Sequence, residues 1–386
     1  MSDPNLDHDW ITDDHRAYAD SVRRFFAEEY QPHRAGYEEA GLVAPAFWRK
    51  AGAMGILGAS APEEYGGQGL PRTFDLVTFL EQCRIHDMGF GASVHGIVMH
   101  YVIQLATDEQ KQRWLPRLIS GDLIGAIAMT EPGTGSDLQS IRTTARRDGD
   151  DFVLNGAKTF ITNGQNAGLI IVVARTDPAA GSRGISLLVV ETEGADGFRR
   201  GRNLKKLGLK AQDTSELFFD DVRVPVANVM GGQAGRGFVQ LMGQLPWERL
   251  MIAYIALGSV RAAFKMTMEY VRERKAFGQR IMDFQNTRFK LAEIKTEIEM
   301  LGAFVDRLTR ELEAGTLTAE RAAMAKFWGT EFQCRAIDAC LQMFGGYGYM
   351  EEYPISQLYA DARVQRIYGG TGEIMREIVA RSIDHD

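Results

Sequence analysis

Residues 250–260, LMIAYIALGSV, form a run without any charged side chain. A helix over this run is apolar on nearly every face, so other parts of the chain have to bury it. The residues just before it, LPWERL at 245–250, include Pro246. Proline suits the first position of a helix because its missing N–H would be unpaired there anyway. This placement predicts Glu248 in the first turn of the helix, at the edge of a core.

Glu248 is a candidate general base. Burial raises the pKa of a carboxyl group, whereas a helix N-terminus and the neighbouring Arg249 favour its anion. These opposing effects can hold the pKa near the range that a general base needs. On this stretch alone the simpler interpretation is structural, with a first-turn acid that complements the helix dipole and pairs with an arginine.

The composition fits a globular protein of two or three packed units, with 386 residues, of which 45% are hydrophobic and 25% charged. The net charge of -7 and the isoelectric point near 5.6 argue against nucleic acid as a partner, because binding to a phosphate backbone needs a net basic surface. The basic run RRGR at 199–202 is the local exception, and we interpret it as a solvated face.

The three cysteines, Cys83, Cys334 and Cys340, are odd in number and are spaced neither for a metal site nor for a disulfide framework. They indicate a reducing compartment. The N-terminal residues MSDPNLDHDWITDD are acidic and contain no apolar stretch, so we expect neither a secretory signal nor an Arg-rich transit sequence. The expected location is the cytoplasm.

The longest run without Asp, Glu, Lys or Arg covers residues 88–107. It is long enough to cross a bilayer, but it contains His95, His100 and several other polar residues, so we predict a buried helix. The two histidines are five residues apart and share a helix face poorly. They are expected in a core or in a pocket lining, with no metal bound.

The pattern along the chain predicts an α+β protein in three parts. The first, 1–121, is helical, with helices over 13–30 and 108–119, the second capped by Thr107, and a Gly- and Pro-rich loop at 60–72. The second, 122–232, has short β-branched and aromatic segments between Gly, Asp and Asn turns, and is expected to be an antiparallel β domain that includes a hairpin limb from 148 to 156. The third, 233–386, shows four helical segments, roughly 238–274, 284–312, 318–344 and 371–383, which predict a four-helix bundle.

Three glycine clusters, at 133–135, 235–237 and 346–348, begin as G-x-G. Each lacks the third glycine of a dinucleotide fingerprint, and none lies between a strand and a helix of a βαβ unit. We therefore expect no Rossmann fold, and a dinucleotide cofactor would be bound in another way.

Five motifs occur in order along nearly the whole chain: TEPGTGSD at 130–137, FITNG at 160–164, RKAFGQ at 274–279, QMFGGYGY at 342–349 and YGGTGEI at 368–374. Together they closely resemble the acyl-CoA dehydrogenase flavoenzymes, and most of all the long-chain and isovaleryl-CoA branch. The three-part division resembles that family's helical, β and helical domains.

The resemblance implies FAD as the cofactor. Hydroxyl and backbone N–H groups suit it because reduced flavin carries charge that fixed donors stabilise. Within one subunit the implied contacts are Ile127, Met129, Thr130, Gly135, Ser136, Phe160, Ile161 and Thr162, with Phe160 and Thr162 against the isoalloxazine ring.

The resemblance also implies that a neighbouring subunit's FAD is shared, and hence an obligate oligomer, typically a homotetramer. Arg274 would bind the pyrophosphate through forked hydrogen bonds. The other residues implied in FAD binding are Phe284, Gln285, Gln342, Gly345 and Gly346 at the shared site, and Thr371 and Glu373 at the adenosine end.

The chain departs from most of the family at the catalytic glutamate, whose usual position is occupied by Gly369. The long-chain and isovaleryl branches carry the base instead in an E-R-L context, which Glu248 matches. The resemblance therefore implies Glu248 as the base that removes the α-proton. It also implies that the backbone N–H of Gly369 binds the thioester oxygen, a contact that needs no side chain.

The activity implied is dehydrogenation of a medium to long or branched acyl-CoA to the trans-2-enoyl-CoA, with flavin N5 accepting the β-hydride and an electron-transferring flavoprotein as electron acceptor. It would belong to fatty acid β-oxidation. The implied substrate contacts are Ser136, Trp247, Arg249, Tyr368 and Gly370.

Two departures and two alternatives remain. Trp247 stands where long-chain relatives have a smaller polar residue, so its indole can shorten the acyl tunnel, and Gln357 replaces a basic residue, which we interpret as a surface or interface change. The acyl or aminoacyl group could instead be carried on a carrier protein. The substitution at Gly369 could also mark an inactive flavin-binding assembly protein.

Overall fold

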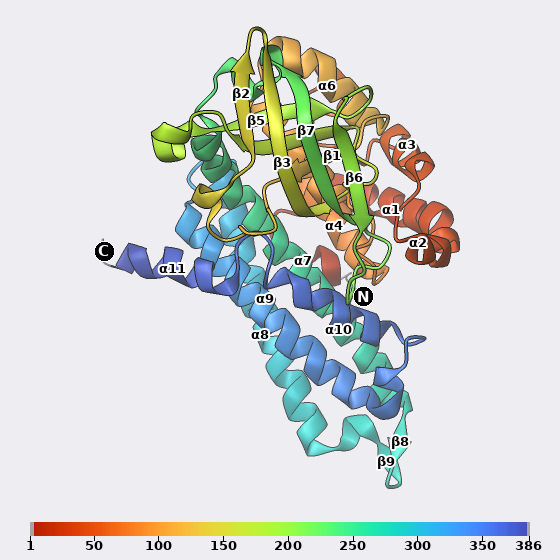
Figure 1. Cartoon of the computed structure of the whole chain (residues 1–386). Coiled ribbons are helices and arrows are strands. Elements are labelled where there is room, and N and C mark those ends of the chain that lie inside the picture. Colours follow the sequence, from red (N-terminus) through yellow and green to blue (C-terminus); the bar gives the residue numbers. More distant parts are fainter. Residues whose placement is uncertain (1–3, 384–386) are drawn as a thin grey trace.

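The computed structural model describes residues 4–383 and places helices where the apolar periodicity predicts them in the N-terminal part (Figure 1). Thr107 caps α6 as expected, because its side-chain oxygen accepts a hydrogen bond from the backbone N–H of Gln110. The charge-free run around His95 and His100 forms a buried helix, as predicted. The N-terminal helices are α1 (Asp13–Phe25), α2 (Arg34–Ala40), α3 (Pro45–Ala53), α4 (Thr73–Arg84), α5 (Ala92–Leu105) and α6 (Asp108–Ser120).

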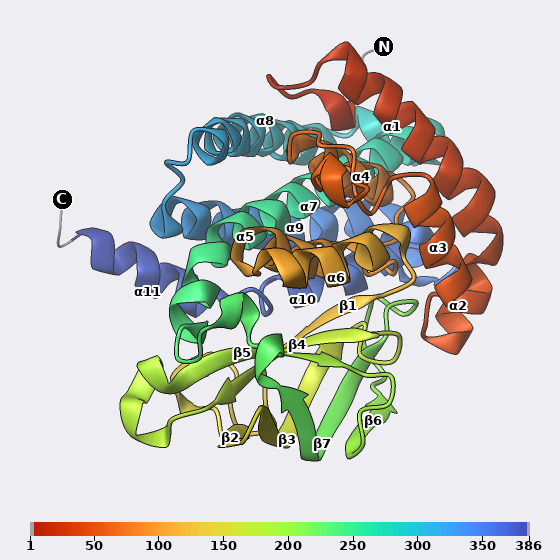
Figure 2. The same cartoon turned by 90° about the horizontal axis from the view of Figure 1, so that it is seen from above.

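The middle part is a β domain, which Figure 2 shows as a separate layer next to the helices. Its strand order is β1-β4-β2-β3-β7-β6, and β5 pairs with β4. The prediction of an antiparallel β domain was wrong in part, because β4 runs parallel to β1 and pairs in parallel with the first residue of β2. The long connections between these strands permit parallel pairing. The strands are β1 (Gly125–Ala128), β2 (Thr144–Asp148), β3 (Asp151–Thr162), β4 (Leu169–Arg175), β5 (Ile185–Glu191), β6 (Phe198–Asn203) and β7 (Thr214–Pro225).

The predicted hairpin limb from 148 to 156 is only the first half of β3. The turn predicted before this limb is present, since Asp148 at the end of β2 pairs with Asp151 at the start of β3. The turn predicted at Asn155 and Gly156 is instead a bulge, where the register with β7 shifts and the strand continues to Thr162. A Cβ built on Gly156 would lie 2.4 Å from Oγ1 of Thr143, so glycine is required by close packing rather than by a turn.

The C-terminal part is helical, as predicted, but one helix was missed. α10 packs against α7 and α9, whereas α11 packs mainly against α9 and projects from the body in Figure 1. The bundle therefore takes α10 as its fourth helix. The elements are α7 (Gly237–Glu273), β8 (Lys275–Ala276), β9 (Gln279–Arg280), α8 (Gln285–Glu313), α9 (Ala319–Phe344), α10 (Pro354–Gln365) and α11 (Gly372–Ile383).

α7 crosses the core and is the helix that the charge-free run predicted. It begins at Gly237, so the prediction that Pro246 occupies the first helical position was wrong, and Pro246 lies inside the helix. By length and composition alone α7 could span a membrane, but 83% of its most apolar window is buried in the protein. This burial is what a core helix needs, because packing against neighbouring helices covers its apolar faces.

The N-terminal and C-terminal helices are joined at several places. Gln357 of α10 donates a hydrogen bond of 3.3 Å from Nε2 to Oε1 of Glu38 on α2, and its Oε1 accepts one from Arg34. The residue therefore lies at an interface within the chain, in line with its interpretation as an interface change. The domain boundaries at 121/122 and 232/233 stay predictions, which fall in the segments between Ser120 and Gly125 and between Pro225 and Gly237.

Candidate active site

Glu248 lies well inside α7, with its side chain only 5% exposed. Its Oε1 accepts a hydrogen bond of 2.9 Å from the hydroxyl of Tyr101 on α5. Burial raises the pKa of Glu248 to about 7, while the Tyr101 hydrogen bond and the charge of Arg249 act in the opposite direction. The helix N-terminus plays no part, because α7 begins at Gly237. The carboxyl group is therefore balanced near neutrality, as a general base requires.

Gly369 and Gly370, which we call the diglycine turn, lie against the same part of α7. Their φ angles are 65° and 94°, a region that favours glycine. A Cβ built on Gly369 would lie 2.5 Å from Cδ1 of Ile252, one helical turn after Glu248. Nε of Arg249 donates a hydrogen bond of 3.4 Å to the carbonyl oxygen of Gly369. The N–H of Gly369 has no acceptor within residues 4–383, which leaves it available to a ligand.

The residues predicted to hold FAD within one subunit meet where the loop after β1 joins β3. The N–H of Thr159 donates a hydrogen bond of 3.0 Å to the oxygen of Thr130. Next to it, Phe160 has a φ of 60° and a ring that is 66% exposed. An exposed aromatic ring beside a loop with open N–H and hydroxyl groups fits a planar, polar ring system such as isoalloxazine. Gly135 and Ser136 in this loop are exposed. Ile127 in β1, Met129 just after it and Thr162 at the end of β3 are half-buried.

One predicted contact in this group can involve only the backbone. The side chain of Ile161 is only 2% exposed and packs in the core of the β domain. Neighbouring residues in a strand point to opposite faces, so Ile161 points inward when Phe160 is exposed. Only the backbone of Ile161 could reach a cofactor.

The residues predicted for the shared site lie mostly on the surface. Arg274, Gln285, Gln342, Gly345, Gly346 and Glu373 are exposed, and Phe284 and Thr371 are half-buried. The guanidinium of Arg274 stacks over the ring of Tyr347, 5.8 Å from its centroid. A Cβ built on Gly346 would meet nothing within 4 Å. The packing of this chain does not explain that glycine, and its open surroundings leave room for another molecule.

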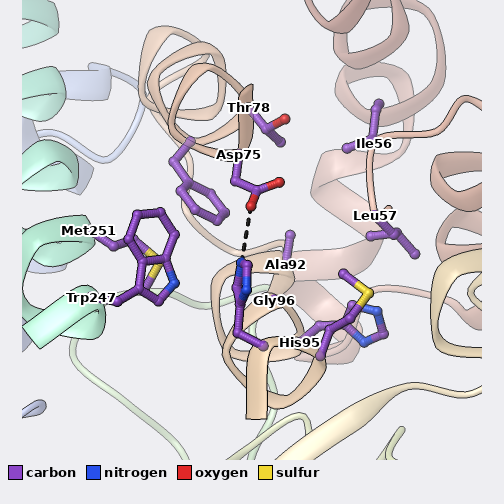
Figure 3. Close-up of a pocket in the computed structure, with 12 residues that line it drawn as sticks. Ile56, Leu57, Asp75, Thr78, Ala92, His95, Gly96, Trp247 and Met251 are labelled. Atoms are coloured by element: carbon purple, nitrogen blue, oxygen red, sulfur yellow. Dashed lines mark hydrogen bonds and ion pairs between the residues drawn. The ribbon is translucent and has the colours of Figure 1, made fainter. Parts of the chain in front are cut away.

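Trp247 faces a pocket between α4, α5 and α7 (Figure 3). Its ring lies 5.5 Å from that of His100, whose Nε2 is bonded to Oδ2 of Asp75 at 3.1 Å. His95 lines the same pocket and accepts a hydrogen bond at Nδ1 from the N–H of Gly125, so both histidines are core and pocket residues as predicted. Within the described residues no cluster suits a metal, and the three cysteines are free.

The remaining predicted substrate contacts surround Glu248. Arg249 is 5% exposed and lies between the base and the diglycine turn. Tyr368, which precedes the turn, is 37% exposed, and Gly370 is half-buried. Base, turn and these side chains thus form one site, although they lie about 120 residues apart in the sequence.

Three domain profiles of one family match this chain: the acyl-CoA dehydrogenase N-terminal domain at residues 12–122, the middle domain at 126–222 and the C-terminal domain at 235–383. The chain belongs to the acyl-CoA dehydrogenase family. The resemblance seen in the sequence motifs, and the predicted order of a helical, a β and a helical domain, are confirmed.

Known relatives of this acyl-CoA dehydrogenase agree with the predicted branch. The mitochondrial long-chain specific acyl-CoA dehydrogenase of Mus musculus is 48% identical over 379 residues, which are 97% of this chain and 88% of the relative. The mitochondrial isovaleryl-CoA dehydrogenase of Solanum tuberosum is 35% identical, covering 96% and 90%. A crystal structure of an acyl-CoA dehydrogenase from Geobacillus kaustophilus superposes with a TM-score of 0.95 at 44% identity, covering 98% of this chain and 100% of the other.

The cofactor prediction is also confirmed. A glutaryl-CoA dehydrogenase from Mycobacterium smegmatis, solved in complex with FADH2, has a TM-score of 0.91 and 30% identity, and the match covers 100% of this chain and 99% of the other. This acyl-CoA dehydrogenase is thus an FAD-dependent oxidoreductase that acts on acyl-CoA thioesters. The role of each site residue stays a prediction.

Tyr101 is a site residue that the sequence did not reveal. It lies in an apolar run, where a tyrosine has no local feature that distinguishes it from a core residue. Only the packing of α5 against α7 brings its hydroxyl to Glu248, across 147 positions of sequence.

Replacing Tyr101 by phenylalanine is expected to raise the pKa of Glu248 further. The change removes a hydrogen-bond donor to a buried carboxylate, and the expected rise in the pKa of Glu248 is about one unit. The pH at which flavin reduction by acyl-CoA is half-maximal should rise by that amount, with the rate at pH 9 within about threefold of wild type. Tyr359→Phe, at an exposed tyrosine of α10, is the control. An unshifted profile would mean that Tyr101 does not act on Glu248.

Proposed function

We propose that Glu248 is the general base of this dehydrogenase. Its carboxylate takes the proton from the α-carbon of the acyl thioester, while bound FAD supplies the acceptor for the hydride that leaves the β-carbon. The loss of these two hydrogens leaves a trans-2-enoyl-CoA. The observation that carries this assignment is a buried carboxyl group with a pKa of about 7, next to a turn whose N–H is free to bind a ligand.

The N–H of Gly369 is proposed to bind the thioester oxygen. Removal of the α-proton moves negative charge onto that oxygen, so a fixed donor there stabilises the charge as it forms. The side chain that most of the family carries at this position is absent, and Ile252 would collide with a Cβ there. Glu248 on α7 supplies the carboxylate that position 369 lacks. We therefore favour an active enzyme over an inactive flavin-binding assembly protein.

The acyl group is proposed to be medium to long or branched. Trp247 and Met251 flank Glu248 on α7 and line a pocket with residues of α4 and α5, which an acyl chain passing the base would approach. The size of the indole favours shorter chains than a small polar residue would. An electron-transferring flavoprotein is the proposed electron acceptor.

A homotetramer in the cytoplasm is the proposed form of the enzyme. Three features support assembly: α11 projects from the body (Figure 1), Arg274 is exposed beside Tyr347, and the Gly345–Gly346 backbone is open. A neighbouring subunit seated on these residues would bury them and complete the FAD site. The free cysteines fit a reducing compartment.

An anaerobic survey of acyl-CoA chain lengths tests the proposed substrate. Straight-chain and branched acyl-CoA thioesters from short to long are expected to bleach the flavin, fastest at medium to long or branched chains. The same acyl groups on a carrier protein give the comparison. Reduction only by carrier-bound acyl groups would replace the proposed substrate by the carrier-protein alternative, and no reduction by any thioester would support the inactive protein.

A further inference from the structure

Lys326 of α9 is a buried cation whose position is not explained by an ion pair. Lys326 is 0% exposed, and its Nζ donates a hydrogen bond of 2.6 Å to the carbonyl oxygen of Gly370. Within residues 4–383 no carboxylate lies at ion-pair distance from this ammonium, since Glu331 is paired with Arg366 and Arg376. Burial and the charge of Arg249 together lower the pKa of Lys326 to about 8, although the charges of Glu373 and Glu331 act in the opposite direction.

Such a placement is costly. A buried ammonium without a counter-ion loses its hydration, which a single bond to a neutral carbonyl does not fully restore. An apolar side chain of similar length, such as methionine, would avoid that cost. The hydrogen bond to Gly370 is the interaction that requires a cation or a donor here.

Lys326 and Arg249 together hold both carbonyl groups of the diglycine turn. Arg249 reaches the oxygen of Gly369 from α7, and Lys326 reaches that of Gly370 from α9. Each bond fixes a peptide plane, and these are the two planes that directly follow the N–H of Gly369. Two consecutive glycines are otherwise the most flexible pair that a chain can contain, so without these bonds the turn would sample many conformations.

We propose that Lys326 is a positioning residue, which holds the diglycine turn so that the N–H of Gly369 meets the thioester oxygen of the substrate. This inference rests on the proposed function, in which that N–H stabilises the charge formed when Glu248 removes the α-proton. A donor that is fixed before the reaction stabilises the charge without reorganising. Lys326 itself touches no reacting atom.

The test isolates the proton-transfer step. A 3-thia-acyl-CoA carries sulfur in place of the β-carbon, so it can lose its α-proton to Glu248 but cannot transfer a hydride. Its ionisation on the enzyme is followed by absorbance over a pH series. Lys326→Met is expected to raise the apparent pKa of the bound analogue by about one to two units and to slow flavin reduction by a saturated acyl-CoA about 10- to 100-fold. Dissociation constants for the saturated substrate should change less than about threefold, because the turn acts on charge that is absent before proton removal.

Three further variants separate a positioning role of Lys326 from other effects of its substitution. Lys326→Arg keeps a cationic donor of similar reach and is expected to retain about a third or more of the wild-type rate. Lys295→Met removes an exposed lysine of α8 and is the control, expected to behave as wild type. Lys326→Gln, whose shorter side chain does not reach Gly370, gives the same readouts if the methionine variant does not fold.

The inference is overturned if Lys326→Met, or Lys326→Gln in its place, ionises the analogue and reduces flavin as wild type does. It is also overturned if the rate falls only with FAD content or melting temperature while the ionisation of the analogue is unmoved, since this result indicates a structural role. Failure of the proposed function looks different, because wild type would then not be reduced by any acyl-CoA, or Glu248→Gln would remain active.

Discussion

Glu248→Gln is expected to slow anaerobic flavin reduction by acyl-CoA about 10³- to 10⁴-fold. Glutamine preserves the size of the side chain and can still accept a hydrogen bond from Tyr101, but it cannot take a proton from the α-carbon. The α-proton of a thioester is only weakly acidic, so a site that has lost its base retains orientation and the Gly369 donor alone. The position at which most of the family carries its base is Gly369 here, so no carboxylate at that position can substitute for Glu248.

The measurement is stopped-flow absorbance of the bound flavin under saturating acyl-CoA. Glu269→Gln is the matched control, since Glu269 lies on the same helix and is exposed. Both variants should retain FAD and bind substrate within about threefold of wild type, because the changed group acts mainly in the transition state. Undiminished reduction by the Glu248 variant would remove Glu248 as the base.

Flavin reduction by the wild-type enzyme is expected to depend strongly on pH in the neutral range. The base must be anionic, and burial raises the pKa of Glu248 to about 7. The rate should therefore be near its maximum above about pH 8 and fall about tenfold for each unit below pH 7, to roughly one hundredth at pH 5. A half-maximal rate near pH 4.5 would mean that the carboxyl is solvated when substrate binds.

The same pKa affects stability with a definite sign. The folded-state pKa lies above the ordinary value of 4.5, so the folded protein holds a proton that the unfolded chain releases between these two values. The contribution of Glu248 to stability is therefore complete below about pH 4.5 and is lost as pH rises through 7, by about 3 kcal/mol. Glu248→Gln removes this loss, so its melting temperature relative to wild type should be higher at pH 8 than at pH 5.

The arrangement of elements followed largely from local sequence. The charge-free run at 250–260 has to be buried, and it forms the buried part of the core helix α7. Thr107 has the side chain and spacing of a helix cap, and it caps α6. The five motifs identified the family because they are long and occur in order. Because Gly369 replaces the usual catalytic glutamate, Glu248 in the E-R-L sequence could be identified as the candidate base. Each of these signals lies within a few neighbouring residues.

Other features depended on contacts between distant parts of the chain. Pro246 has the chemistry of a helix start, yet the buried helix runs through it because packing on α4, α8 and α9 stabilises α7 on both sides. Asn155-Gly156 has the chemistry of a turn, but pairing with β7 and the close approach of Thr143 make it a bulge.

The sequence by itself determined the family, the three-part order of helices and strands, and Glu248 as the candidate base. Tertiary structure alone decided that Tyr101 donates to that base, and that Lys326 and Arg249 hold the diglycine turn. The physical reason is the distance along the sequence over which each kind of interaction acts. Periodicity, capping and motifs are local properties that sequence displays directly, whereas a hydroxyl or an ammonium acquires a specific partner only when separate helices pack together and exclude water.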